Sequence, residues 1–169
     1  MTSGTLFIRA WRIVAILGFL VSLFSSYISY PEEVAVRFDD TNRAIQYINR
    51  ETLFYVSIAI FLISLMSLRA LGRMFPRVPS DSLPIPNQAE WAAHRPQLNT
   101  VFINWFYALT AAITTILALG LFVLSLLNQS ARTVRFIDYG GLLPVCTAII
   151  IIVLAALPIR LFMKPSADE

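Results

Sequence analysis

Few side chains in this sequence could carry out chemistry. Catalysis by a nucleophile needs a serine or cysteine close to a histidine and a carboxylate. The only histidine, His94, stands beside Arg95 in a polar segment and is far along the chain from the only cysteine, Cys146. We therefore expect His94 to be an exposed residue near a helix end and Cys146 to be a small residue of the core.

Sites for metals and cofactors also lack their usual motifs. The sequence has no H-E-x-x-H, no spaced set of cysteines and histidines, no P-loop and no G-x-G-x-x-G. One histidine cannot supply both axial ligands of a bis-histidine haem. An enzyme acting on lipid would have only scattered carboxylates, such as Asp39, Asp40 and Glu51. The sequence therefore predicts no metal, no cofactor and no enzymatic activity.

Four long hydrophobic stretches without an acidic or basic residue dominate the chain, at about 13–30, 53–68, 101–127 and 139–159. A bilayer core of about 30 Å needs a helix of about 20 apolar residues, and fewer when flanking side chains reach the interface. The composition, 57% apolar and 14% charged, fits a membrane protein. The sequence predicts an all-α membrane protein, a single domain over 1–169 with helices at about 8–30, 50–72, 97–127 and 139–163.

Basic residues are distributed unequally between the two ends of this predicted bundle. Eight flank the termini and the central loop, and five lie in the segments 31–52 and 128–138. By the positive-inside rule, both termini and the central loop lie in the cytoplasm and the other two segments lie outside. The clustering of arginines at helix ends also explains the net charge of +3 without a nucleic-acid partner.

The first outer loop, residues 31–52, has the pattern of a small β-hairpin. Residues 34–38 alternate between apolar and other side chains, residues 39–42 form a turn cluster, and residues 44–48 are a second short apolar run. Isolated hairpins are marginally stable, so we expect this one to pack on helix ends, with Phe38 and Tyr47 as its anchors in the interfacial zone. Asn49 is placed to cap the second helix, with Glu51 in the first turn.

The central loop, residues 69–99, carries four prolines between positions 76 and 86, a spacing that favours an extended path. Asn87 followed by Glu90 is typical of a capping box and predicts a short helix that carries Trp91. We expect Trp91 to lie at the membrane surface. Pro96 suits the first turn of the third long helix, which is long enough to extend beyond the membrane or to tilt.

Small residues recur at helical spacing on two of the predicted spans. Gly18, Ser22 and Ser26 lie four residues apart on the first helix. A similar stripe on the third helix consists of Ala108, Ala111, Ala112, Thr115 and Ala118. Such faces allow close helix packing, either inside one chain or against another subunit. Asn104, the amide within the third span, is expected to form a hydrogen bond between helices.

Several residues of the first outer loop form a recognisable pattern: Pro31, Val34, Phe38, Tyr47, Asn49 and Arg50. This pattern resembles the loop of a family of uncharacterised bacterial four-helix membrane proteins, which share it with the immunity protein against a sporulation-delaying toxin. The family's loop reads approximately Leu-Pro-x-x-(Ile/Val)-x-x-His-(Phe/Trp), followed by a glycine-containing turn, an aromatic residue and Ser-(Lys/Arg). The resemblance implies a four-helix fold in the bacterial inner membrane.

The central loop adds a second similarity, because Ile85-Pro86-Asn87 with Trp91 looks like the Leu-Pro-Asn-Lys-Asp-Tyr-Trp segment of some members. The resemblance covers Met1 to about Leu127. Arg37 replaces the family's histidine, so a metal or proton role of that histidine does not carry over. The turn also lacks glycine, which leaves Asn42 as the candidate for a left-handed conformation.

Because the spans contain no acid or base, the sequence predicts a binding role. The expected function is a non-enzymatic inner-membrane protein, either an accessory or structural subunit of a larger membrane complex or an immunity-like protein that binds a partner. Membrane lipids and other membrane subunits are the expected partners. The alternative is an oligomeric passive transporter or channel for small solutes, with serine and threonine faces turned to water. The candidate partner-binding residues are Pro31, Arg37, Phe38, Tyr47, Pro86, Asn87 and Trp91.

Overall fold

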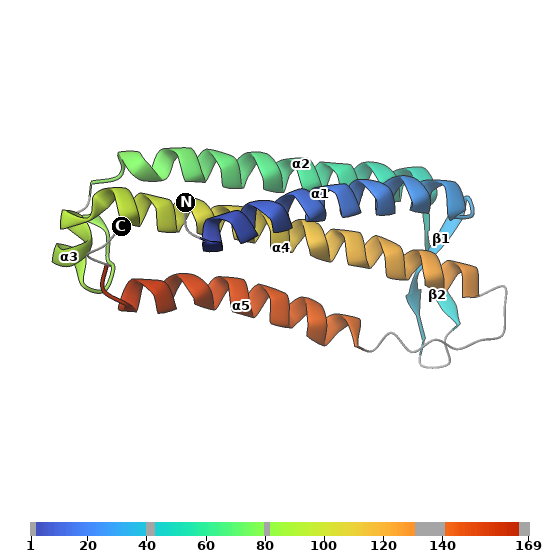
Figure 1. Ribbon diagram of the computed structural model, residues 1–169. Coiled ribbons are helices and arrows are strands. Elements are labelled where there is room, and N and C mark those ends of the chain that lie inside the picture. Colours follow the sequence, from blue (N-terminus) through green and yellow to red (C-terminus); the bar gives the residue numbers. More distant parts are fainter. Residues whose placement is uncertain (1–2, 40–42, 80–81, 131–140, 166–169) are drawn as a thin grey trace.

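The computed structural model describes residues 3–39, 43–79, 82–130 and 141–165. Long helices run side by side, with a pair of strands at one end of the bundle and a short helix at the other (Figure 1). The elements in chain order are α1 (Ser3–Ser29), β1 (Glu33–Phe38), β2 (Ala44–Asn49), α2 (Arg50–Met74), the 3₁₀ turn η1 (Phe75–Arg77), α3 (Gln88–Ala93), α4 (Arg95–Ser130) and α5 (Leu142–Phe162).

Four helices of the described chain are long and apolar enough to cross a membrane, with mean hydropathies between 2.0 and 2.8. These are α1, α2, α4 and α5, which confirms the four predicted spans and indicates a multi-pass membrane protein. Helix α4 has 36 residues, or about 54 Å at 1.5 Å per residue, and is therefore longer than a bilayer core requires. The predicted start of the last helix, at residue 139, lies outside the described residues.

Helix α4 is the centre of the bundle, because α1, α2 and α5 all pack against it. Its alanine stripe explains this position: Ala111 and Ala112 are completely buried and Ala108 is almost so. Small side chains allow neighbouring backbones to approach closely, which matters in lipid, where apolar surface alone gives no drive to associate. The small-residue face predicted for this helix is therefore used for packing within the chain.

The small-residue face predicted for α1 is only partly used. Ser26 is buried, but an added side chain at Gly18 would meet no atom within 4 Å. The larger residues Phe19 and Leu23 pack with Leu121 of α4, and the ring of Phe19 stacks on that of Phe61 from α2. Spacing alone did not distinguish the two faces, since both repeat with a helical period.

The two strands expected between residues 31 and 52 pair antiparallel, but their anchors differ from the prediction. Val34 is completely buried and Ala35 nearly so, whereas Phe38 is half-buried and Tyr47 is 54% exposed. The pairing is irregular on both sides of Arg37, but the two shifts cancel, so Phe38 pairs with Ala44 in the same register as Val34 with Ile48. Strict alternation had placed Phe38 on the same face as Val34. The turn residues Asp40 and Asn42 lie outside the described residues.

Two predicted helix caps have different outcomes. Asn49 caps α2 as expected, its side chain accepting a hydrogen bond from the backbone N–H of Glu51 at 2.8 Å. The short helix α3 begins after Asn87, but the capping box is wrong, because Asn87 has a left-handed backbone (φ 55°) and its side chain does not cap the helix. Pro96 lies in the first turn of α4 as predicted.

Candidate functional site

Helix α5 is attached to the bundle mainly through α4. Midway along α5, Val153 packs against the alanine face of α4, and the indole Nε1 of Trp105 donates a hydrogen bond to the carbonyl of Val153 at 2.7 Å. Pro158 lies inside α5 and has no N–H, so it leaves the carbonyl of Leu154 without its usual helical donor. Trp105 therefore binds α5 one residue before the carbonyl that Pro158 leaves without a donor.

The end of α5 is held by α3. The last carbonyls of a helix have no partner within the helix. Two of them accept side-chain hydrogen bonds here: the carbonyl of Leu161 from Trp91 Nε1 at 3.0 Å, and that of Phe162 from Asn87 Nδ2 at 3.3 Å. Trp91 has no exposed surface and packs with Phe75, Leu98 and Leu161. We call the contact between Trp91, Asn87 and the end of α5 the α3 cap.

The α3 cap corrects the prediction that Trp91 lies at the membrane surface, since its ring is enclosed by protein. Asn87, predicted to cap its own helix, caps the far end of another one. Glu90, predicted to complete the capping box, instead forms an ion pair with Lys164 at 2.9 Å. Hydrogen bonding to the Glu90 carboxylate raises the pKa of Lys164. Both side chains are well exposed, so we expect the pair to add little stability.

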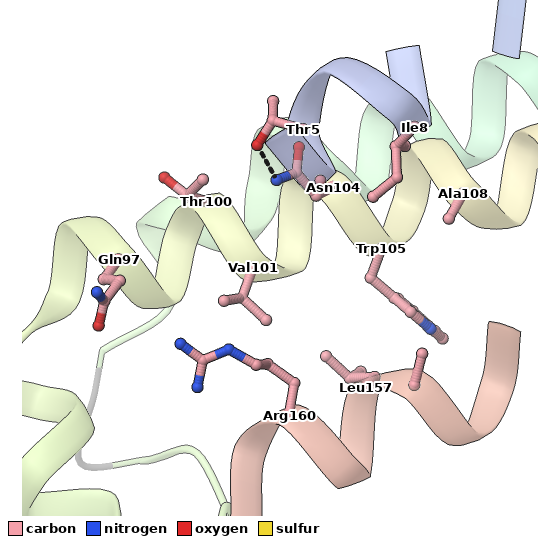
Figure 2. Close-up of a pocket in the computed structure, with 12 residues that line it drawn as sticks. Thr5, Ile8, Gln97, Thr100, Val101, Asn104, Trp105, Ala108, Leu157 and Arg160 are labelled. Atoms are coloured by element: carbon pink, nitrogen blue, oxygen red, sulfur yellow. Dashed lines mark hydrogen bonds between the residues drawn. The ribbon is translucent and has the colours of Figure 1, made fainter. Parts of the chain in front are cut away.

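A groove of about 430 Å³ lies between the start of α1, the first half of α4 and the last turns of α5 (Figure 2). One part of its wall is apolar, formed by residues such as Ile8, Val101 and Leu157, and another part is polar. Asn104 donates a hydrogen bond to the hydroxyl of Thr5 at 2.9 Å, which confirms the predicted bond between helices. We call this space the α1–α4–α5 groove.

Arg160 supplies the positive charge of this groove. Figure 2 shows its guanidinium projecting from α5 into the space facing α4. The guanidinium carbon also lies 5.2 Å from the centre of the Trp91 ring, a cation–π contact. Among the described residues, its only hydrogen bond is a long one to the carbonyl of Lys164, at 3.4 Å. The groove thus offers an apolar surface with one cation and several hydrogen-bonding groups at its edge.

Within the described ranges, no three His, Cys, Asp or Glu residues gather where they could hold a metal ion. His94 is exposed at the end of α3, as expected, and its Nδ1 lies 3.0 Å from the carbonyl of Glu90. Cys146 is half-buried on α5 rather than part of the core.

Replacing Asn104 with alanine is expected to destabilise the chain by about 1 kcal/mol, the usual value of a hydrogen bond between membrane helices. The Asn104–Thr5 bond joins α4 to the start of α1 at the groove. Thermal unfolding in detergent measures the effect. Thr100→Ala is the matched control, because Thr100 is exposed and its hydroxyl bonds only within its own helix. Equal changes in the two variants would contradict the assignment.

At the opposite end of the bundle, the strand pair is fastened to α4 by an amide. Ala35 donates its backbone N–H to Asn128 Oδ1 at 2.9 Å and accepts from Asn128 Nδ2 at 3.1 Å. Near the strands, Arg50 Nη1 donates a hydrogen bond to the carbonyl of Tyr30 at 3.1 Å. The Tyr30 hydroxyl in turn donates to the carbonyl of Leu121 at 2.8 Å. The strand pair is therefore bound to α4 through Asn128, and Arg50 and Tyr30 link the helix ends beside it.

The predicted partner-binding residues fall into two groups at opposite ends of the bundle (Figure 1). Pro31, Arg37, Phe38 and Tyr47 belong to the strand end, where Arg37 and Tyr47 are exposed. Pro86, Asn87 and Trp91 belong to the α3 end, where Asn87 and Trp91 are engaged within the chain. The structure therefore does not bring the seven residues together in one site.

Comparisons with protein-family models, with curated proteins and with solved structures found no match. The resemblance of the first outer loop to the four-helix bacterial family therefore stays a prediction.

Sequence reasoning missed Trp105, Asn128 and Arg160 as residues that organise the two ends. Trp105 and Asn128 bond to backbone groups distant in the sequence, at Val153 and Ala35. The residues around each of them do not indicate which distant group they bond to. The sequence contained one signal: a side chain with a polar group on an otherwise apolar span needs a hydrogen-bond partner in lipid.

Proposed function

We propose that this chain is a non-enzymatic integral membrane protein that binds a partner within the membrane, as an accessory or structural subunit of a larger complex or as an immunity-like protein. One observation carries the proposal. Helix α5 is the most apolar span, with a mean hydropathy of 2.8, yet only 6% of its apolar stretch is buried within the chain. It is held along one side by α4, and its remaining surface is available to another protein.

The exposed face of α5 is suited to a transmembrane helix. Large apolar side chains cover it, with Ile151 58% exposed and Ile152 67% exposed. The α1–α4–α5 groove opens beside this face and contributes polar groups such as Asn104 and Arg160. In lipid, helices associate through close packing and hydrogen bonds. A partner helix seated against α5 at the groove would gain both.

We place the chain in the bacterial inner membrane with both termini and the α3 end in the cytoplasm. Basic residues support this orientation: Arg69 and Arg73 lie in the last turns of α2, and Arg77 follows it. Arg160 and Lys164 lie at the end of α5, at the same end of the bundle. The strand pair then lies on the outer face, where Arg37 and Tyr47 are exposed to a partner.

The test is purification of the tagged chain from its native membranes in mild detergent, followed by mass spectrometry of the proteins that accompany it. A distinct membrane protein is expected to copurify. Ile152→Trp, on the exposed face of α5, should reduce its recovery. Val21→Trp is the matched control, because Val21 on α1 is equally exposed, at 69%, and lies on a different helix.

Three outcomes would count against this function. A chain that always purifies alone would oppose any partner. Equal loss of the partner in the Ile152→Trp and Val21→Trp variants would oppose binding through α5. A chain that recovers only copies of itself around a hydrated path would instead favour the alternative of a passive transporter or channel.

A further inference from the structure

A second recess, of about 320 Å³, lies between α1, α2 and α4 and contains two arginines. Arg12 comes from α1 and Arg69 from α2, so the two cations reach the same space from different helices. The other residues of its wall are Ile13, Ile16, Leu65, Tyr107 and Thr110. We call this space the two-arginine recess; it shares no lining residue with the α1–α4–α5 groove.

The charges in the two-arginine recess are not neutralised by the described part of the chain. The guanidinium carbon of Arg12 lies 4.1 Å from the centre of the Tyr107 ring, a cation–π contact. Arg69 is exposed, and within the described ranges it forms neither an ion pair nor a hydrogen bond. The one ion pair found there joins Lys164 and Glu90, away from this recess. Two like charges facing one space repel each other, which favours an anion between them.

An adjoining recess of about 270 Å³ extends the basic region. It shares Arg69 and Tyr107 with the first recess and adds Arg73, one helical turn further along α2. Its surface also includes Gly72, where an added side chain would sit 3.6 Å from the ring of Phe106, so the helices approach closely here. Arg12, Arg69 and Arg73 thus line two adjoining recesses that both include Tyr107, whose hydroxyl forms no hydrogen bond with the described residues.

The two-arginine recess changes from charged to apolar within one helical turn. On α1, Arg12 is followed by Ile13 and Ile16 at the start of an apolar stretch. On α2, Leu65 precedes Arg69 by one turn at the end of another apolar stretch. Both helices thus present a cation at the membrane boundary and an apolar wall just beyond it. A phospholipid has the same order of groups, a charged headgroup followed by acyl chains.

We propose that the two-arginine recess binds an anionic phospholipid. The headgroup phosphate lies between the guanidinium groups of Arg12 and Arg69, within reach of the Tyr107 hydroxyl. One acyl chain follows Ile13, Ile16 and Leu65 into the membrane. Arginine is suited to this contact because its planar fork can donate two hydrogen bonds to one phosphate. Basic pockets between transmembrane helices bind anionic headgroups for the same reason.

Native mass spectrometry of the full chain in mild detergent tests the site, with phosphatidylglycerol and phosphatidylcholine of identical acyl chains as probes. Phosphatidylglycerol should bind more tightly. The double variant Arg12→Gln/Arg69→Gln should weaken the binding of phosphatidylglycerol about thirtyfold. Each basic residue near an anionic headgroup usually contributes about 1 kcal/mol, and two such contributions correspond to that factor. Binding of phosphatidylcholine should not change.

Two further variants keep the test informative if the double glutamine variant fails to fold. Arg12→Lys/Arg69→Lys retains both charges and should keep most of the preference for phosphatidylglycerol. Leu65→Trp retains both arginines but fills the apolar part of the recess, and it should weaken the binding of phosphatidylglycerol. The matched control is Arg37→Gln/Arg43→Gln, which removes two exposed arginines at the strand end and should leave the affinity unchanged.

Several results would overturn the proposal. Equal binding of the two lipids would remove the charge argument, and an equal loss in the Arg37→Gln/Arg43→Gln control would show a general charge effect. Displacement of phosphatidylglycerol by free glycerol phosphate, with no effect of Leu65→Trp, would identify a site for soluble phosphate. No residue of α5 lines the recess, so the effect of Ile152→Trp on partner recovery tests the proposed function and not the lipid site.

Discussion

Replacing Trp91 with alanine is expected to lower the free energy of unfolding by about 3–5 kcal/mol, the usual cost of removing a fully buried aromatic side chain. Three contacts would be lost together. The ring fills the space between Phe75, Leu98 and Leu161, its Nε1 caps the carbonyl of Leu161, and Arg160 lies over its face at 5.2 Å. Since α5 is held along only one side, we expect its last turn to separate from the bundle.

Unfolding in detergent measures the loss of stability in Trp91→Ala, and hydrogen exchange of residues 159–162 measures the loosening of α5. Trp91→Phe is the matched control. It keeps a buried ring and loses the indole donor, so it should cost only about 1 kcal/mol. If both variants were equally stable, or if exchange in the last turn of α5 stayed slow in Trp91→Ala, the α3 cap would not be what holds α5.

The parts of this fold that follow from local physics could be predicted. Long apolar stretches have to form helices in lipid, because every backbone polar group needs a partner there, and all four spans are present. Asn49 and Glu51 set the start of α2 through contacts two residues apart, so this boundary was also predictable. The alanine stripe of α4 indicated the helix that others pack against.

The parts that depend on distant pairs could not be predicted. Trp91 and Leu161 are 70 residues apart in the chain, and Asn128 and Ala35 are 93 apart. The same local signals fit more than one partner: Asn87 can cap its own helix or another, and a loop tryptophan can face headgroups or fill a core. Only the folded arrangement selects between these, so the candidate site was predicted less well than the spans.

At the strand end, a correct prediction of the strands did not identify the residues that are buried. The alternation of residues 34–38 indicated a strand, and a strand is present. The buried contacts are Val34 and Ala35, near the start of β1, whereas Phe38, the last residue of the strand, is only half-buried. Alternation alone does not show which part of a strand packs on the helices, because that contact depends on a residue distant in the chain, here Asn128.

Replacing Asn128 with alanine is expected to release the strand pair from α4 at a cost of about 2 kcal/mol, because its two hydrogen bonds to Ala35 are lost and the backbone groups of this buried residue are left without partners. The measurement is limited proteolysis of residues 31–52, which should become faster, together with unfolding in detergent. Helix α4 itself should remain intact, because alanine favours a helix more than asparagine does.

Two controls separate this amide from the exposed surface of the strands. Asn128→Asp keeps the acceptor for the N–H of Ala35 but loses the donor to its carbonyl, so its effect should be intermediate. Tyr47→Ser removes a side chain that is 54% exposed and should leave proteolysis nearly unchanged. Faster cleavage in Tyr47→Ser than in Asn128→Ala would show that the aromatic ring, rather than the amide and Ala35, holds the strands in place.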